Sequence, residues 1–159
     1  ASDGKALQEA WRRAVAEQTP PLEYQLLTDA AQALDGRYAE RAVLEAGIAV
    51  EVAITTRYRE KRLAQGDSIQ QIEKTLKGKL GLYHRARLLA PELGVAAPDS
   101  RAVPPSDGGF PRLLEVNAAR NDVAHTGELK PQTDAADLVG ACRALVDQVA
   151  SDPWRVPAI

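Results

Sequence analysis

The sequence predicts an all-α fold, an antiparallel bundle of four to six helices, from its composition and its apolar periodicity. Hydrophobic residues make up 45% of the chain but aromatic residues only 4%, so Leu, Val, Ile and Ala must build the core. This composition, with 26% charged residues, favours helices over strands. Apolar residues recur at helical spacing, and turns that contain glycine or proline separate the periodic segments.

Two helices are expected near the N-terminus. Residues 3–17 are typical of a polar amphipathic helix in which Trp11 is an anchor. Pro20 and Pro21 end this segment and open a second helix at about 22–34, because proline fits the first helical position.

A long third helix is expected over residues 37–64. Between Ala42 and Ile54 it is apolar nearly all round, which indicates burial on more than one side. Small residues such as Gly47 would let a neighbouring helix approach closely, either from the same chain or from a partner subunit. Glu51 shares the arc of these inward residues, so its carboxylate is expected to be drawn inward.

A fourth helix is predicted over residues 68–90. Ser68 and Gln71 have the spacing of a capping box. Leu80 is among its expected core positions, and Gly78 and Gly81 are expected to mark a bend within it.

Residues 91–110 are predicted to be a loop of unusual length, which is typical either of disorder or of a functional lid that gates a substrate. The next helix is expected to begin near Pro111. The final helix starts at Pro131 or at Thr133 and continues to about Ala150.

The chain length supports one domain. Its 159 residues can bury a core without disulfides or metals. We divide the chain into an N-terminal helix and linker (1–21), a helical domain (22–150) and a C-terminal tail (151–159). No window approaches the apolar length of a membrane span, so no membrane association is expected.

Cysteine and histidine are scarce. Cys142 is the only cysteine, which excludes an internal disulfide and fits a reducing cytoplasm. Its apolar neighbours predict a small core residue and not a nucleophile. With two histidines and one cysteine, no spacing points to a zinc site, and neither a metal nor a cofactor is expected.

The net charge of −2 argues against general nucleic-acid binding. A nucleic-acid enzyme would therefore need positive charge concentrated locally. Each basic run taken alone is typical of a solvated helix face, whereas a patch beside a cleft would indicate binding. Two runs are candidates: Arg57, Arg59, Lys61 and Arg62, then Lys74, Lys77, Lys79, Arg85 and Arg87.

One short segment, 120–125 (RNDVAH), carries the groups needed to hold a phosphodiester and move a proton beside it. Asn121 and His125 are four residues apart on a helix and project close together. Arg120 lies about 140° from His125, and its guanidinium is long enough to reach back across Ala124.

The motif is expected on or beside the packing face of its helix, where polar groups must find partners. The partner could be a ligand phosphate or the same motif of a second copy. Alternatively, Asn121 and His125 satisfy helix ends and Arg120 pairs with a carboxylate. The apolar residues of the adjoining arc are Leu113, Val116, Val123 and Ala124.

The R-N-x-x-x-H pattern, near the start of the last third of a small helical domain, resembles the signature of the HEPN superfamily. Upstream, residues 33–43 and 46–53 are similar to early helices of that family, in which a helix with small and acidic residues packs against the motif helix. The similarity covers roughly residues 22–150 and implies a HEPN-like bundle.

The resemblance implies a metal-independent endoribonuclease that works as a homodimer, with both motifs facing a shared cleft. The ribose 2′-hydroxyl would attack the adjacent phosphate and leave a 2′,3′-cyclic phosphate and a 5′-hydroxyl. By position, His125 would transfer protons and Arg120 would bind the scissile phosphate. Asn121 would orient one of them or contact the RNA, and Glu51 is a candidate to orient Arg120 or His125.

The resemblance to this family also implies a role in a toxin–antitoxin, phage-defence or stress system, with an antitoxin or regulatory partner. Some members that are silenced by a nucleotidyltransferase carry a tyrosine two residues after the histidine. Gly127 stands there in this chain, which argues against that form of regulation. Other members do not cleave RNA, so the alternative is a non-catalytic helical module that binds a nucleotide or a protein.

Overall fold

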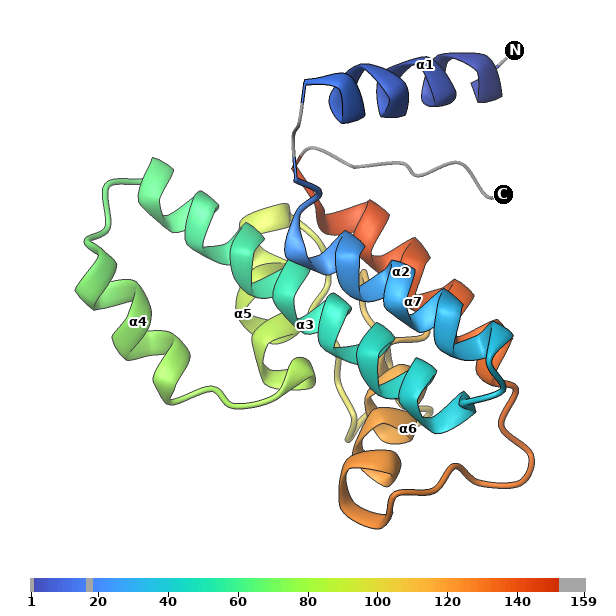
Figure 1. The fold of residues 1–159 in the computed structure, drawn as a ribbon. Coiled ribbons are helices and arrows are strands. Elements are labelled where there is room, and N and C mark those ends of the chain that lie inside the picture. The colour runs from blue at the N-terminus through green and yellow to red at the C-terminus, as the bar shows by residue number, and fades with distance from the viewer. Residues whose placement is uncertain (1, 17–18, 152–159) are drawn as a thin grey trace.

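The computed structural model describes residues 2–16 and 19–151, and within them every regular element is a helix. The all-α prediction is confirmed (Figure 1), but the described residues form seven helices and not the expected four to six. The helices of the described residues are α1 (Ser2–Val15), α2 (Leu22–Asp35), α3 (Ala39–Ala64), α4 (Ile69–Lys77), α5 (Leu82–Leu93), α6 (Leu113–Thr126) and α7 (Ala135–Val149). The predicted tail lies almost wholly outside the described residues.

The long helix α3 is the centre of the fold. It packs against α2, α7, α5 and α6, and its C-terminal end reaches α4 (Figure 1). Its predicted burial on several sides is confirmed, because Ala42, Ala46, Val50 and Ile54 are all fully enclosed. Alanine and glycine on this helix leave room for neighbours on more than one face.

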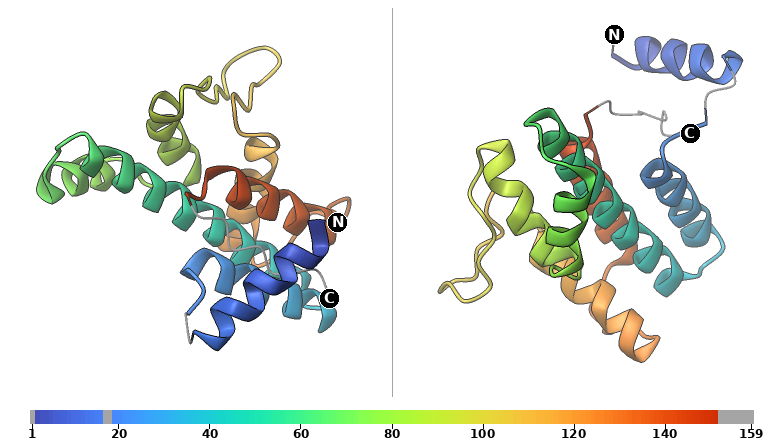
Figure 2. Two further views of the ribbon diagram at one scale, coloured as in Figure 1. Left: turned by 90° about the horizontal axis from the view of Figure 1, so that it is seen from above. Right: turned by 90° about the vertical axis from the view of Figure 1, so that its left-hand side faces the viewer.

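Helix α1 stands apart from the other helices (Figures 1 and 2). The predicted anchor Trp11 is 72% exposed, so the expectation that it packs is wrong for this chain alone. Within the described residues, no helix is both long and apolar enough to cross a membrane.

The predicted single helix over residues 68–90 is wrong, because the chain forms two helices there. The capping box of Ser68 and Gln71 opens α4 as expected, but α4 ends at Gly78. Gly81 has a φ of +88°, a conformation that glycine adopts readily and that cannot continue a helix. Leu80, expected in the core, is 72% exposed in this break.

The predicted loop begins later than expected, and its two ends lie together while most of the residues between them are exposed. Helix α5 extends past Pro91 and ends where Gly94 adopts a left-handed conformation. Further on, Asp99 and Ser106 form an isolated antiparallel bridge. A Cβ on Gly108 would lie 2.3 Å from the backbone oxygen of Ala96, so the two ends of the loop are in direct contact.

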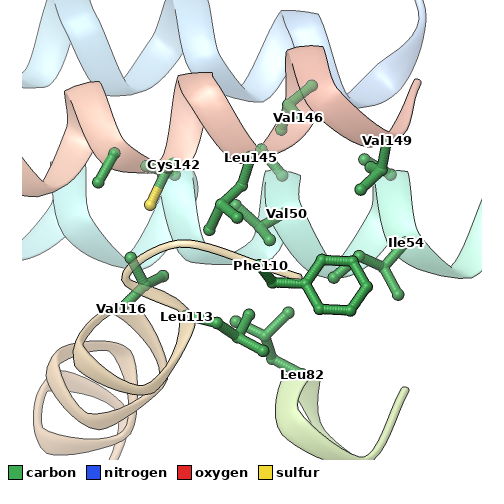
Figure 3. Packing of buried hydrophobic residues seen from close by; sticks show 14 of the residues in the cluster. Val50, Ile54, Leu82, Phe110, Leu113, Val116, Cys142, Leu145, Val146 and Val149 are labelled. Atoms are coloured by element: carbon green, nitrogen blue, oxygen red, sulfur yellow. The ribbon is translucent and has the colours of Figure 1, made fainter. Parts of the chain in front are cut away.

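Phe110 anchors the end of this loop in the core. Its ring is completely buried between α3, α5, α6 and α7 (Figure 3). Ile54 lies beside the ring on α3 and Leu113 beside it on α6 (Figure 3). The single phenylalanine of the chain therefore ties the loop to four helices.

Cys142 is a free, buried thiol on α7, as predicted. Burial raises the pKa of Cys142 from 9.0 to about 12, because the thiolate would lose its hydration. The thiolate is the reactive form of cysteine.

We expect Cys142 to be nearly inert in the native protein. Iodoacetamide at pH 8 should alkylate it on the order of a hundredfold or more slowly than in the urea-unfolded chain, because burial limits both thiolate formation and access. Mass spectrometry of timed samples measures both rates. Equal rates in the two states would contradict the buried position.

Candidate functional site

Loop residues immediately before and after helix α6 define where it begins and ends. Asp107 accepts hydrogen bonds from the backbone N–H groups of Arg112 (3.2 Å) and Leu114 (2.8 Å). These bonds satisfy two N–H groups at the start of α6, which begins at Leu113, two residues after the predicted start near Pro111. Gly127, with a φ of +74°, ends the helix just after the motif.

Arg120 reaches the surface of α3 at a glycine. A Cβ added to Gly47 would lie 2.8 Å from Cγ of Arg120 and 3.0 Å from its Cβ. The aliphatic stem of Arg120 therefore occupies the space that a larger residue at position 47 would fill. The small residue noted in the sequence admits α6, a helix of the same chain.

Glu51 lies one turn along α3 from Gly47 and binds two arginines. Its Oε2 accepts from Nη2 of Arg120 at 2.8 Å, and its Oε1 lies 3.4 Å from Nη1 of Arg85 on α5. The same Nη1 of Arg85 donates to Oγ1 of Thr55 at 2.8 Å. One carboxylate thus faces two guanidinium groups.

This cluster is largely buried. The side chains of Glu51, Arg85 and Arg120 are 17%, 21% and 22% exposed. Nη1 of Arg120 donates to Oδ1 of Asn121 at 3.4 Å, whereas its Nε is buried without a hydrogen-bond partner. The contact expected between Glu51 and Arg120 is present, and the catalytic role of each residue stays a prediction.

His125 does not join this cluster. It is exposed in the last turn of α6, and within the described residues it makes no hydrogen bond or ion pair. The guanidinium of Arg120 turns toward α3 and not back across Ala124, since Glu51 offers it a charged acceptor there. Ala124 is itself exposed, so its predicted place on the packing arc is wrong, while Leu113, Val116 and Val123 are buried as expected.

A hollow of about 1130 Å³ lies beside the cluster. Its wall includes Glu51, Arg85 and Arg120, and apolar surface comes from Ile48 and Val52 of α3. Neither Asn121 nor His125 lines it. No residue of the 94–112 loop lines it either, so the predicted gating role of that loop does not apply to this hollow.

Arginines from both predicted basic runs line this hollow. Arg57 and Arg59 line it together with Arg85, whereas the lysines of both runs do not. Arg57 lies 3.4 Å from Glu60, another wall residue, and Arg59 lies 2.6 Å from Glu73 on α4. Much of the positive charge is therefore already balanced by carboxylates.

Thr55 is a site residue that the sequence analysis did not identify, and Arg85 was predicted only as part of a basic run and not as a partner of Glu51. Thr55 lies four residues after Glu51, so helical spacing alone could have placed both on one face. Arg85 was predicted to lie on a single continuous helix over residues 68–90, so its position beside Glu51 was not predicted. Its position follows from the break at Gly81, which starts a separate helix.

No group of three or more histidine, cysteine, aspartate or glutamate residues that could hold a metal ion occurs in residues 2–16 and 19–151. Comparison of the chain with protein-family models gave no match, and neither did comparisons with curated proteins and with solved structures.

Proposed function

We propose that this chain is a metal-independent endoribonuclease of the HEPN type that cleaves single-stranded RNA as a homodimer. One observation carries the proposal. Helix α6 holds Arg120 in a set orientation through Glu51, while His125 on the same helix stays exposed and unpartnered within the described residues. A fixed cation and an accessible proton-transfer group are the two parts that the reaction needs.

The chemistry assigns one role to each group. His125 would accept the proton of the ribose 2′-hydroxyl as its oxygen attacks the adjacent phosphorus. The bond from phosphorus to the 5′-oxygen breaks, the 5′-oxygen takes up a proton from the His125 imidazolium or from water, and a 2′,3′-cyclic phosphate remains. Arg120 would stabilise the negative charge on the phosphate oxygens, and Asn121 would orient its guanidinium.

The separation of Arg120 and His125 supports the proposed dimer. Five residues along a helix correspond to about 7.5 Å of rise, and the two side chains leave α6 in different directions. A second copy on the exposed side of α6 would bring two motifs to one cleft. Light scattering that finds only monomer at micromolar concentration would contradict the dimer.

The test is cleavage of a single-stranded RNA in EDTA. We expect His125→Ala to lower the rate by about 10²–10⁴-fold, the range of general acid–base catalysis. His84→Ala is the matched control, because His84 is the other histidine of the chain and is also exposed. Wild type should leave cyclic-phosphate ends and should not cut the same strand made with 2′-deoxyribose.

Two outcomes would contradict cleavage by this motif. One is cleavage that His125→Ala retains, and the other is cleavage that EDTA abolishes. Arg120→Lys accompanies Arg120→Ala, because the lysine keeps a cation at a position that contacts Glu51. Thermal unfolding of each variant separates a lost activity from a lost fold.

The second candidate function is a non-catalytic module that binds a nucleotide or a protein. The ion pair of Arg120 with Glu51 favours this function, because an arginine with a purely structural role would also pair with a carboxylate. If wild type cuts no RNA, and the variants of Arg120 and His125 change only stability, this second function is the correct one.

A further inference from the structure

We propose that Arg85 and Arg120, arranged around Glu51 at the wall of the hollow, form a binding site for a phosphate group. The phosphate would belong to a nucleotide or to a nucleic-acid backbone. This inference goes beyond the proposed cleavage, because binding here needs neither His125 nor a second copy of the chain. It shares Arg120 and its partner Glu51 with the proposed function.

The first support is the charge balance of the cluster. Within the described residues, Glu51 is the only carboxylate within 4.0 Å of Arg85 or of Arg120. Two guanidinium groups therefore share one negative charge, and one positive charge is left over. These side chains are about four-fifths buried, where an uncompensated charge is costly and attracts an anion more strongly than at the surface.

Two other arginines that line the hollow, Arg57 and Arg59, differ in this respect. Arg57 is paired with Glu60, and Arg59 makes two hydrogen bonds to Glu73 at 2.6 and 3.1 Å. Each of these pairs is neutral by itself. Among these four arginines, the excess of positive charge is thus at Arg85 and Arg120.

The second support is that Arg85 and Arg120 have N–H groups that the described residues do not fully use as hydrogen-bond donors. Arg85 uses Nη1 toward Thr55 and Glu51, and its Nε donates to the backbone oxygen of Lys79 at 3.3 Å. Its Nη2 donates to no described residue. Arg120 uses Nη2 for Glu51 and makes only a long bond from Nη1 to Asn121. Guanidinium N–H groups that form no hydrogen bond, or only a long one, are available to donate to the oxygens of a phosphate.

The third support is the shape of the hollow. Its volume of about 1130 Å³ is slightly above the usual range of small-ligand sites. Ile48 and Val52 place apolar surface in the same hollow as the two arginines. A phosphate at the arginines would leave room beside it for the sugar and base to which it is attached.

The test measures binding without cleavage. The probes are a fluorescein-labelled strand of single-stranded oligothymidine DNA, which has no 2′-hydroxyl to attack, ADP, and inorganic phosphate. Anisotropy follows the DNA and calorimetry follows the other two. We expect Arg85→Gln to weaken binding about tenfold, the effect of one lost charged hydrogen bond.

Arg87→Gln is the matched control, because Arg87 lies on the same helix, is exposed and does not line the hollow. It removes the same charge and should change affinity less than about twofold. Arg85→Lys, which keeps the charge but loses the guanidinium, should fall between the two. Equal losses in Arg85→Gln and Arg87→Gln would overturn the proposal, and so would the absence of binding of all three probes by wild type at millimolar concentration.

The two sources of phosphate give different results. Tight binding of ADP that depends on Arg85 identifies a nucleotide, whereas binding of the DNA alone identifies a backbone. A readout on wild type covers the case in which Arg85→Gln does not fold. In NMR spectra, the Nε–H signals of Arg85 and Arg120 should shift with the bound probe, and that of Arg87 should not.

Failure of the cleavage proposal can be told apart from failure of this one. His125→Ala should bind the DNA as wild type does. If wild type cuts no RNA but still binds DNA through Arg85, the phosphate site stands and only the cleavage proposal is lost.

Discussion

Replacing Phe110 by alanine is expected to lower the free energy of unfolding by about 3–5 kcal/mol. The ring is completely buried, and its loss would leave a cavity between α3, α5, α6 and α7 (Figure 3). It would also release the end of the 94–112 loop, which leads directly into α6. Unfolding in urea, followed by circular dichroism at 222 nm, measures the change.

Leu80→Ala is the control for this substitution. Leu80 is a large apolar residue that is 72% exposed, so its truncation should stay within about 0.5 kcal/mol. Phe110→Leu, which fills part of the cavity, should lie between the two. If Phe110→Ala destabilises the protein no more than Leu80→Ala does, the loop is not anchored as described.

Glu51→Gln is the second substitution with a large expected effect. It keeps the shape of the side chain but removes the charge that two arginines share. We expect the free energy of unfolding to fall by about 2 kcal/mol. This is less than the loss for a fully buried pair, because roughly one-fifth of each side chain is in contact with solvent.

An added anion should restore part of that stability. Sulfate can take the place of the missing carboxylate, so it should raise the melting temperature of Glu51→Gln more than that of wild type at matched ionic strength. The control is Glu60→Gln on the same helix, since Glu60 is exposed and its pair with Arg57 is long, at 3.4 Å. If the two variants lose the same stability, or if sulfate stabilises both equally, Glu51 is not the centre of the cluster.

Much of the secondary structure was predictable because it depends on neighbours in the sequence. The capping box at Ser68 and the buried stretch of α3 both follow from local spacing. The break at Gly81 was not predictable in this way. Apolar residues continue across it at nearly helical spacing, and only the packed chain shows that Leu80 points to solvent.

In the candidate site too, some features were predictable from the sequence and others were not. Helical spacing correctly placed Glu51 on an inward face and grouped Arg120 with Asn121 on one helix. It could not decide which way the long side chain of Arg120 turns. That direction depends on Gly47 and Glu51, which come from another helix and are distant in sequence.

Sequence by itself determined that this chain is helical, where the capped helices begin, and that Arg120, Asn121 and His125 lie on one helix. These properties depend on residues within a few positions of one another. Only the tertiary structure decided that Arg85 and Arg120 share Glu51 and that His125 stands away from them. Contacts of this kind join residues 34 to 69 positions apart, and their geometry is set by how α3, α5 and α6 pack.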